Sequence, residues 1–122
     1  MDVHERLSLE AVSEHTLIAC EHIHRYEWAS ALCRDLRVVD LACGTGYGSA
    51  LLIGGARSVH GVDNDAATVD TASVTVGRET SATFEVADAV AFLRRNLSED
   101  YDVIVCFAVF YTHLTLQTIL RV

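Results

Sequence analysis

A glycine-rich loop and the acids around it are the residues of this chain best placed to do chemistry. The segment Val38-Val39-Asp40-Leu41-Ala42-Cys43-Gly44-Thr45-Gly46 runs from β-branched residues through an acid into small residues. Glycines between a strand and a helix let a ligand approach the backbone closely, and the exposed N–H groups there bind a polar or anionic group. About twenty residues after Gly44, Asp63 follows a second apolar run, at the spacing of an acid that binds ribose hydroxyls. The pattern predicts a site for a nucleotide-type cofactor.

The spacing of the glycines narrows the class of cofactor. A dinucleotide site needs G-x-G-x-x-G, whereas Gly44, Gly46 and Gly48 follow G-x-G-x-G and Ser49 stands at the third position. The carboxylate of Asp40, just before the loop, would repel a pyrophosphate and attract an ammonium group. A fragment of a nicotinamide-dependent oxidoreductase therefore remains as a disfavoured alternative.

The order of the motifs resembles that of the class I S-adenosylmethionine-dependent methyltransferases. Their first motif reads apolar-apolar-Asp-Leu-x-Cys-Gly-x-Gly, as residues 38–46 do. Asp63 is similar to the acid that binds the ribose in that family, and Asp88 to the acid that reaches the adenine amino group. Residues 101–107 resemble the strand that ends beside the methionine part of the cofactor. The resemblance runs from about Glu21 to about Phe107 and implies S-adenosyl-L-methionine as the cofactor.

A histidine-rich segment before the loop extends this resemblance. Residues 21–26 read Glu-His-Ile-His-Arg-Tyr and resemble the Glu-His-x-His-Arg-Tyr stretch of some bacterial small-molecule and sugar-pathway methyltransferases, where a helix closes over the cofactor. This implies that Arg25 pairs with the cofactor carboxylate and that Tyr26 lines its pocket; the alternative is a solvated helix with a buried Tyr26. His22 and His24 would point about 200° apart on a helix, so no metal site is expected. The cofactor-binding residues implied by the resemblance are Arg25, Tyr26, Asp40, Ala42, Gly44, Thr45, Gly46, Asp63, Asn64, Asp88, Ala89 and Phe107.

Each of these motifs also has an ordinary structural interpretation. Asp40 could simply be a helix cap at the end of a strand, and Asp63 could belong to a turn. Asp88 could be a helix N-cap, which is compatible with binding adenine. Gly48 could serve close packing alone. Cys43 has no base at helical or turn spacing, so it is not expected to act as a nucleophile.

Apolar runs and helical periodicities alternate along the chain and predict the elements that hold these residues. One or two helices are expected from about Ser8 to Leu36. The fourth strand is apolar throughout and is therefore expected to be buried on both faces. The pattern predicts an α/β fold: a Rossmann-like, three-layer αβα domain with N-terminal helices and an incomplete parallel sheet of about four strands. The expected strands are 37–41, 57–62, 82–87 and 102–107, and the expected helices are 46–53, from Asp65 onward, and from Asp88 to about Asn96.

The resemblance also sets expectations for the rest of the chain. The family's sheet has seven strands, so residues 1–122 are expected to form a single, truncated cofactor-binding domain. The fourth strand would then be an unpaired apolar edge that favours self-association, with one more helix between His113 and Val122. After Phe107 many relatives read Phe-Glu-Val-x-Glu-His, and this chain departs from that pattern. Tyr111 and His113 therefore match no catalytic role, and no catalytic residue is assigned.

The composition of the chain limits the kinds of molecule that it can bind and the cellular compartment in which it is expected. The chain of 122 residues has a net charge of −8 and contains no lysine, which argues against nucleic acid as a substrate because its phosphates would meet like charge. No membrane span is expected, and four cysteines without a C-x-x-C pair indicate a reduced, cytoplasmic protein. The predicted function is methyl transfer to a small-molecule acceptor, with a non-catalytic, truncated methyltransferase-like chain as the alternative.

Overall fold

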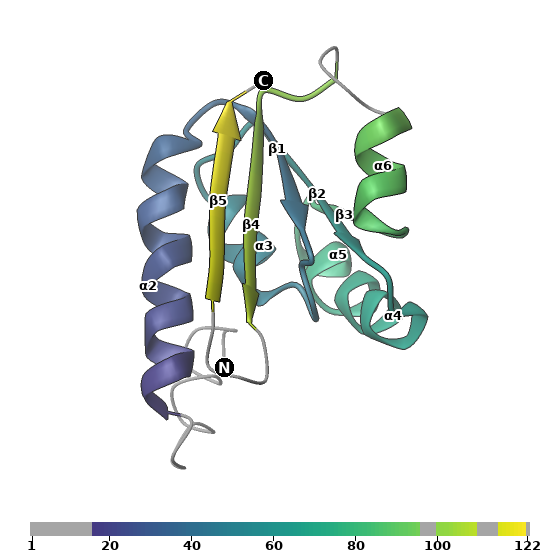
Figure 1. Ribbon diagram of the computed structural model, residues 1–122, viewed down its shortest axis with the longest axis horizontal. Coiled ribbons are helices and arrows are strands. Elements are labelled where there is room, and N and C mark those ends of the chain that lie inside the picture. The colour runs from purple at the N-terminus through teal and green to yellow at the C-terminus, as the bar shows by residue number, and fades with distance from the viewer. Residues whose placement is uncertain (1–15, 96–99, 110–114, 122) are drawn as a thin grey trace.

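The computed structural model describes residues 16–95, 100–109 and 115–121 (Figure 1). Strands and helices alternate through this part of the chain, as the sequence predicts. Tyr111 and His113 lie outside the described residues, as does the start of the expected N-terminal helices. The elements are α2 (Thr16–Leu32), β1 (Arg37–Leu41), α3 (Tyr47–Leu52), β2 (Ser58–Asp63), α4 (Ala66–Val74), α5 (Val76–Glu79), β3 (Thr83–Val86), α6 (Ala89–Arg95), β4 (Val103–Val109) and β5 (Thr115–Arg121).

The strands form one sheet in the order β3-β2-β1-β4-β5. Strands β1 to β4 are parallel, and β1 lies in the middle, where Val39 pairs with His60 of β2 and with Ile104 of β4. The carboxyl ends of the parallel strands therefore meet at one edge of the sheet, which brings together the residues that follow each strand. This arrangement confirms the predicted Rossmann-like fold with four parallel strands.

The end of the chain differs from the expectation. Residues Thr115–Arg121 form the strand β5 rather than part of a helix, and they pair with β4 antiparallel, from Val103 opposite Arg121 to Val109 opposite Thr115. β-Branched residues recur in this segment and favour an extended chain, and the pairing satisfies the backbone N–H and C=O groups along β4. The prediction that β4 is an unpaired edge is therefore wrong, and the self-association inferred from that edge loses its basis.

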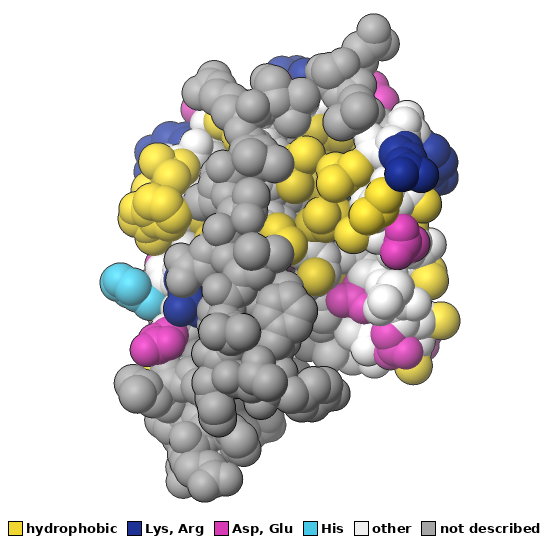
Figure 2. Space-filling model, in the orientation of Figure 1, with side chains coloured by type: hydrophobic (Ala, Val, Ile, Leu, Met, Phe, Trp, Pro, Cys, Tyr) yellow, Lys and Arg dark blue, Asp and Glu magenta, His cyan; other side chains and the backbone are white. Residues whose placement is uncertain are grey.

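Helices cover the two faces of the sheet unequally (Figure 1). On one face, α2, α3 and α5 pack over a buried core that includes Val38, Val59 and Val105. On the other face, Phe92 of α6 packs against Val39 and neighbouring side chains. Within the described part of the chain, α6 is the one helix on this second face, and Figure 2 shows hydrophobic side chains at the surface between β5 and α6.

Candidate functional site

The loop between β1 and α3 turns through three left-handed residues: φ is 60° at Ala42, 59° at Gly44 and 93° at Gly46. A Cβ atom added at Gly44 would meet nothing within 4 Å, so this part of the backbone faces open space. A Cβ atom at Gly46 would instead lie 3.1 Å from the Phe84 ring and 3.2 Å from Ala72. Glycine thus leaves room for a ligand at position 44, whereas at position 46 it serves the packing of the protein itself.

Asp63, the last residue of β2, is held beside this loop by two backbone donors. Its Oδ2 atom accepts a hydrogen bond of 3.0 Å from Gly44 N–H, and its Oδ1 atom accepts one of 3.1 Å from Asp65 N–H. An ionised carboxylate has about four lone-pair positions, so about two remain for further donors. The carboxylate is therefore oriented before any ligand arrives and can still accept from two adjacent hydroxyl groups.

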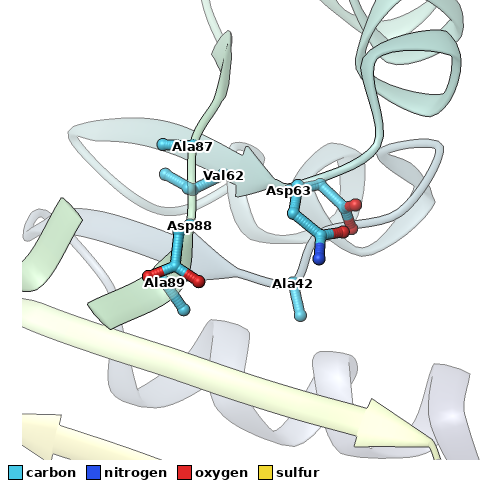
Figure 3. Close-up of a pocket in the computed structure, with 7 residues that line it drawn as sticks. Ala42, Val62, Asp63, Ala87, Asp88 and Ala89 are labelled. Atoms are coloured by element: carbon cyan, nitrogen blue, oxygen red, sulfur yellow. The ribbon is translucent and has the colours of Figure 1, made fainter. Parts of the chain in front are cut away.

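A pocket of about 140 Å³ opens at the carboxyl ends of the first three strands. Figure 3 shows the carboxylates of Asp63 and Asp88 on two sides of it, with Ala42 near Asp63 and Ala89 beside Asp88. Asp88 also caps α6, because its Oδ2 atom accepts a hydrogen bond of 3.0 Å from Ala91 N–H. The residues that line the pocket are Ala42, Val62, Asp63, Asn64, Ala87, Asp88 and Ala89.

Five of the predicted cofactor-binding residues thus share one pocket: Ala42, Asp63, Asn64, Asp88 and Ala89. Sequence reasoning missed Val62 and Ala87, which supply apolar lining. The signal for both was present, since each directly precedes one of the two acids at the end of a strand. Thr45 is exposed in the loop and is not among the lining residues.

Asp40 lies apart from the pocket surface, fully buried under α2 and α3. Its Oδ1 atom accepts a hydrogen bond of 2.8 Å from the Tyr26 hydroxyl, and its Oδ2 atom accepts one of 2.7 Å from the Ser49 hydroxyl. Burial raises the pKa of the Asp40 carboxyl to about 6, and the two hydrogen bonds oppose that rise. In this structure Asp40 ties both helices to β1, and its carboxylate is not exposed to an ammonium group.

Four rings gather beside this network, and we refer to His22, Tyr26, Tyr47 and Phe107 as the aromatic cluster. The rings of Tyr26 and Phe107 meet edge-on at 5.0 Å between centroids, and His22 lies 5.3 Å from Tyr26 and 5.4 Å from Tyr47. The His22 Nε2 atom is 2.7 Å from the carbonyl oxygen of Phe107. Because a carbonyl only accepts, His22 carries its proton on Nε2. Tyr26 is buried, which agrees with the alternative interpretation of residues 21–26 as a solvated helix with a buried Tyr26.

The other polar candidates have local partners. Arg25 forms an ion pair of 3.6 Å with Glu21, one turn earlier in α2. Burial raises the pKa of the Cys43 thiol to about 12, which keeps it protonated and agrees with the expectation that it is not a nucleophile. Within the residues that the structure describes, no group of three or more side chains could hold a metal ion. Nor is any helix described here long and apolar enough to cross a membrane.

Comparisons with known proteins agree with this arrangement. A family model for a methyltransferase domain matches residues 38–122. No curated protein matches the chain. One similar solved structure is the SAM-dependent methyltransferase from Agrobacterium tumefaciens, at 25% identity and a TM-score of 0.60, over 80% of this chain and 36% of that one.

A second similar protein is magnesium protoporphyrin IX methyltransferase from Synechocystis PCC 6803. Its structure with bound SAH gives 24% identity and a TM-score of 0.60, over 78% of this chain and 46% of that one. Its structure with bound SAM gives 25% identity and a TM-score of 0.55, over 73% of this chain and 45% of that one. The chain thus spans less than half the length of each of these structures. Since the family model covers well over half of the sequence, this chain belongs to the methyltransferase domain family.

Proposed function

We propose that this chain binds S-adenosyl-L-methionine and supplies the cofactor half of an enzyme that methylates a small molecule. The observation that carries the proposal is the Asp63 carboxylate, which the Gly44 and Asp65 N–H groups orient at the edge of a pocket shared with Asp88. Two acids at the ends of adjacent parallel strands, next to a glycine loop, suit a ligand that presents ribose hydroxyls and an adenine amino group.

The groups of this ligand can be assigned to named atoms of the pocket. The two ribose hydroxyls donate to the lone pairs of Asp63 that the backbone leaves available. The adenine amino group donates to the Asp88 oxygen that does not cap α6, and Val62 and Ala87 provide apolar surface for the base. The methionine part then extends from the ribose over Gly44, where the absence of a Cβ atom leaves the space open.

Methyl transfer asks little more of these residues than binding and orientation. The sulfonium of the ligand is itself a good leaving group, so holding the acceptor atom in line with the methyl group supplies much of the rate acceleration. A general base is needed only where the acceptor must lose a proton during the transfer. In this proposal the chain's residues fix the position of the methyl donor, and the acceptor is bound by the complete protein.

A small, uncharged or cationic acceptor in the cytoplasm suits the character of the chain. The net charge of −8 disfavours a polyanion such as nucleic acid, and the likeness of residues 21–26 to small-molecule methyltransferases supports the same choice. All four cysteines are free thiols, which supports a reducing compartment. Cofactor binding without transfer to any acceptor would support the non-catalytic alternative instead.

Calorimetry with S-adenosyl-L-methionine tests the proposal directly. The variant Asp63→Ala removes the acceptor for both ribose hydroxyls, and since hydrogen bonds to a charged group contribute roughly 1.5–3 kcal/mol each, affinity should fall at least tenfold. Asp70→Ala is the matched control, because it removes the same charge from an exposed position on α4 that is not among the lining residues. Equal affinities for wild type and Asp63→Ala, or stronger binding of NAD than of S-adenosyl-L-methionine, would refute the proposal.

A further inference from the structure

Three polar side chains join α6 to β2 and β3 on the second face of the sheet. The carboxylate of Glu85, on β3, has a partner at each oxygen: Oε1 lies 2.8 Å from His60 Nε2, and Oε2 accepts a hydrogen bond of 2.8 Å from the Arg95 guanidinium. We refer to His60, Glu85 and Arg95 as the α6 clamp. Arg95 is the last residue of α6, and Asp88, which lines the pocket, caps the other end. The clamp and the pocket thus lie at opposite ends of one short helix.

The carboxylate at the centre of the clamp is held in a fixed orientation. The ring of His60 stacks on that of Tyr101 at 6.1 Å between centroids, and its Nδ1 atom lies 2.7 Å from the Thr83 hydroxyl. Because a carboxylate only accepts, His60 donates to Glu85 from Nε2. The hydrogen bonds from Arg95 and from His60 lower the pKa of the Glu85 carboxyl, so it is ionised at pH 7. Its direction toward Arg95 is therefore set by the partner on β2.

The packing of α6 makes its tilt depend on this clamp. Phe92 is the one fully buried side chain of this helix, all of which the structure describes, and Leu93 packs partly against the same core. A helix held at one level can rock about that level. Since each residue advances a helix by about 1.5 Å, Asp88 lies about 6 Å from Phe92 along the axis, and Arg95 about 4.5 Å in the other direction. A displacement at Arg95 is therefore passed on to Asp88 at a similar size.

The side chain of Asp88 is the part of the pocket that such a tilt would move. The backbone just before it is tied to β2, because Ala87 N–H donates a hydrogen bond of 3.0 Å to the Asp63 carbonyl. The Asp88 carboxylate is instead oriented by α6, through the hydrogen bond from Ala91 N–H. The Asp63 carboxylate is oriented from the glycine loop, by Gly44 N–H. A change in the clamp should therefore alter contact with the adenine amino group and spare contact with the ribose.

We propose that Glu85 and Arg95 are positioning residues: their ion pair sets the tilt of α6 and so holds the Asp88 carboxylate where it can accept from the adenine amino group. This inference rests on the proposed function, which assigns that amino group to Asp88. The Arg95 side chain is 58% exposed, and an ion pair at an exposed position adds little to stability. The pair is therefore expected to affect how the pocket recognises the base rather than whether the chain folds.

The test compares two ligands by calorimetry: S-adenosylhomocysteine and an analogue in which hydrogen replaces its adenine amino group. The wild type should bind S-adenosylhomocysteine more tightly, because the analogue lacks the donor to Asp88. Arg95→Met keeps an apolar stem but cannot pair with Glu85, so this preference should fall roughly three- to tenfold, while the affinity for the analogue changes little. Arg94→Met is the matched control, because it removes the same charge from an exposed residue of the same helix outside the clamp.

A second variant tests whether the effect passes through the ion pair. Glu85→Gln removes the charge of the other partner and should reduce the preference by a similar factor. The double variant with Arg95→Met should lose no more than either single variant, because effects that pass through one contact are not additive. Urea denaturation of each variant should give an unfolding free energy close to that of the wild type.

Several results would overturn this inference and leave the cofactor site in place: an unchanged preference, equal weakening of both ligands, additive losses in the double variant, or the same loss of preference in Arg94→Met. Loss of the fold in both single variants would make the ion pair a structural contact and overturn it too. Equal binding of the two ligands by the wild type would refute the assignment of the amino group to Asp88 and this inference with it. Binding of neither ligand by the wild type would overturn the proposed function as well.

Discussion

Asp40 and Asp63 are both strand-end acids beside the glycine loop, and their carboxylates have opposite surroundings. Asp63 borders a pocket and is oriented by backbone N–H groups, whereas Asp40 is fully enclosed and is held by two side-chain hydroxyls. The sequence places both acids correctly at the ends of their strands. It does not reveal which one is covered, because the covering residues Tyr26 and Ser49 come from two different helices.

The buried carboxyl of Asp40 should make stability depend on pH. Its pKa is about 6 in the folded chain against an ordinary 3.8, so the folded state holds the proton more tightly. The resulting stabilisation is fully present below about pH 4 and is lost as the pH rises through about 6. A difference of about two pKa units corresponds to up to about 3 kcal/mol. We expect urea denaturation between pH 4 and 8 to show this decline in the free energy of unfolding.

The variant Asp40→Asn isolates the effect of this one group. Its amide can accept from Tyr26 and donate to Ser49, but it cannot ionise, so its unfolding free energy should lack this part of the decline. Asp70→Asn changes an exposed acid and should keep the wild-type profile. Parallel pH profiles for wild type and Asp40→Asn would show that the carboxyl titrates normally.

At the scale of elements, the glycines of the loop between β1 and α3 have two different roles: leaving space for a ligand and allowing close packing inside the protein. The sequence alone does not distinguish these roles. The sequence suggests that a side chain at Gly46 would fill cofactor space, whereas in the structure it would press on Phe84 and Ala72 inside the protein. Gly48 is confirmed as a packing residue, because a Cβ atom there would lie 2.2 Å from the Tyr26 ring. Open space remains at Gly44 alone among these three positions.

Substitutions at Gly44 and Gly46 should therefore separate binding from stability. Gly44→Ala requires a left-handed alanine, which costs about 1 kcal/mol, and its methyl group would occupy the ligand's space, so affinity for S-adenosyl-L-methionine should fall while the fold survives. Gly46→Val adds overpacking to a positive φ and should lower the unfolding free energy by roughly 2–5 kcal/mol. Urea denaturation and calorimetry on both variants measure the two effects. A stable Gly46→Val variant that no longer binds would restore the interpretation from sequence.

At the scale of the whole molecule, local patterns predicted the parallel part of the fold and missed its antiparallel edge. The runs that form β1 and β2 are followed by glycine-rich or acidic turn residues, and the run that forms β4 is apolar throughout, so the positions of all three follow from the residues themselves. The strand β5 depends on its partner: residues Thr115–Arg121 gain their backbone hydrogen bonds from β4. The contact between His22 and Phe107 was missed for the same reason, since the two residues are 85 positions apart in the sequence.

The central place of β1 in the sheet has a consequence for hydrogen exchange. The strand is paired with β2 on one side and with β4 on the other, whereas among the described strands β3 pairs with β2 alone. Amide hydrogens of Val38 to Leu41 should therefore exchange with deuterium only through global unfolding, and those on the outer side of β3 should exchange through local opening. Mass spectrometry or NMR in D₂O would measure both rates.

Ligand binding should change these exchange rates unevenly. The glycine loop directly follows β1, and in the proposed site it lies against the ligand. We therefore expect a bound ligand to raise the protection of the amides at Gly44 and the residues after it through local contacts. In β1 the ligand should slow exchange only as far as it raises the global unfolding free energy. Unchanged exchange in the loop while β1 gains protection would mean that the ligand binds elsewhere on the sheet.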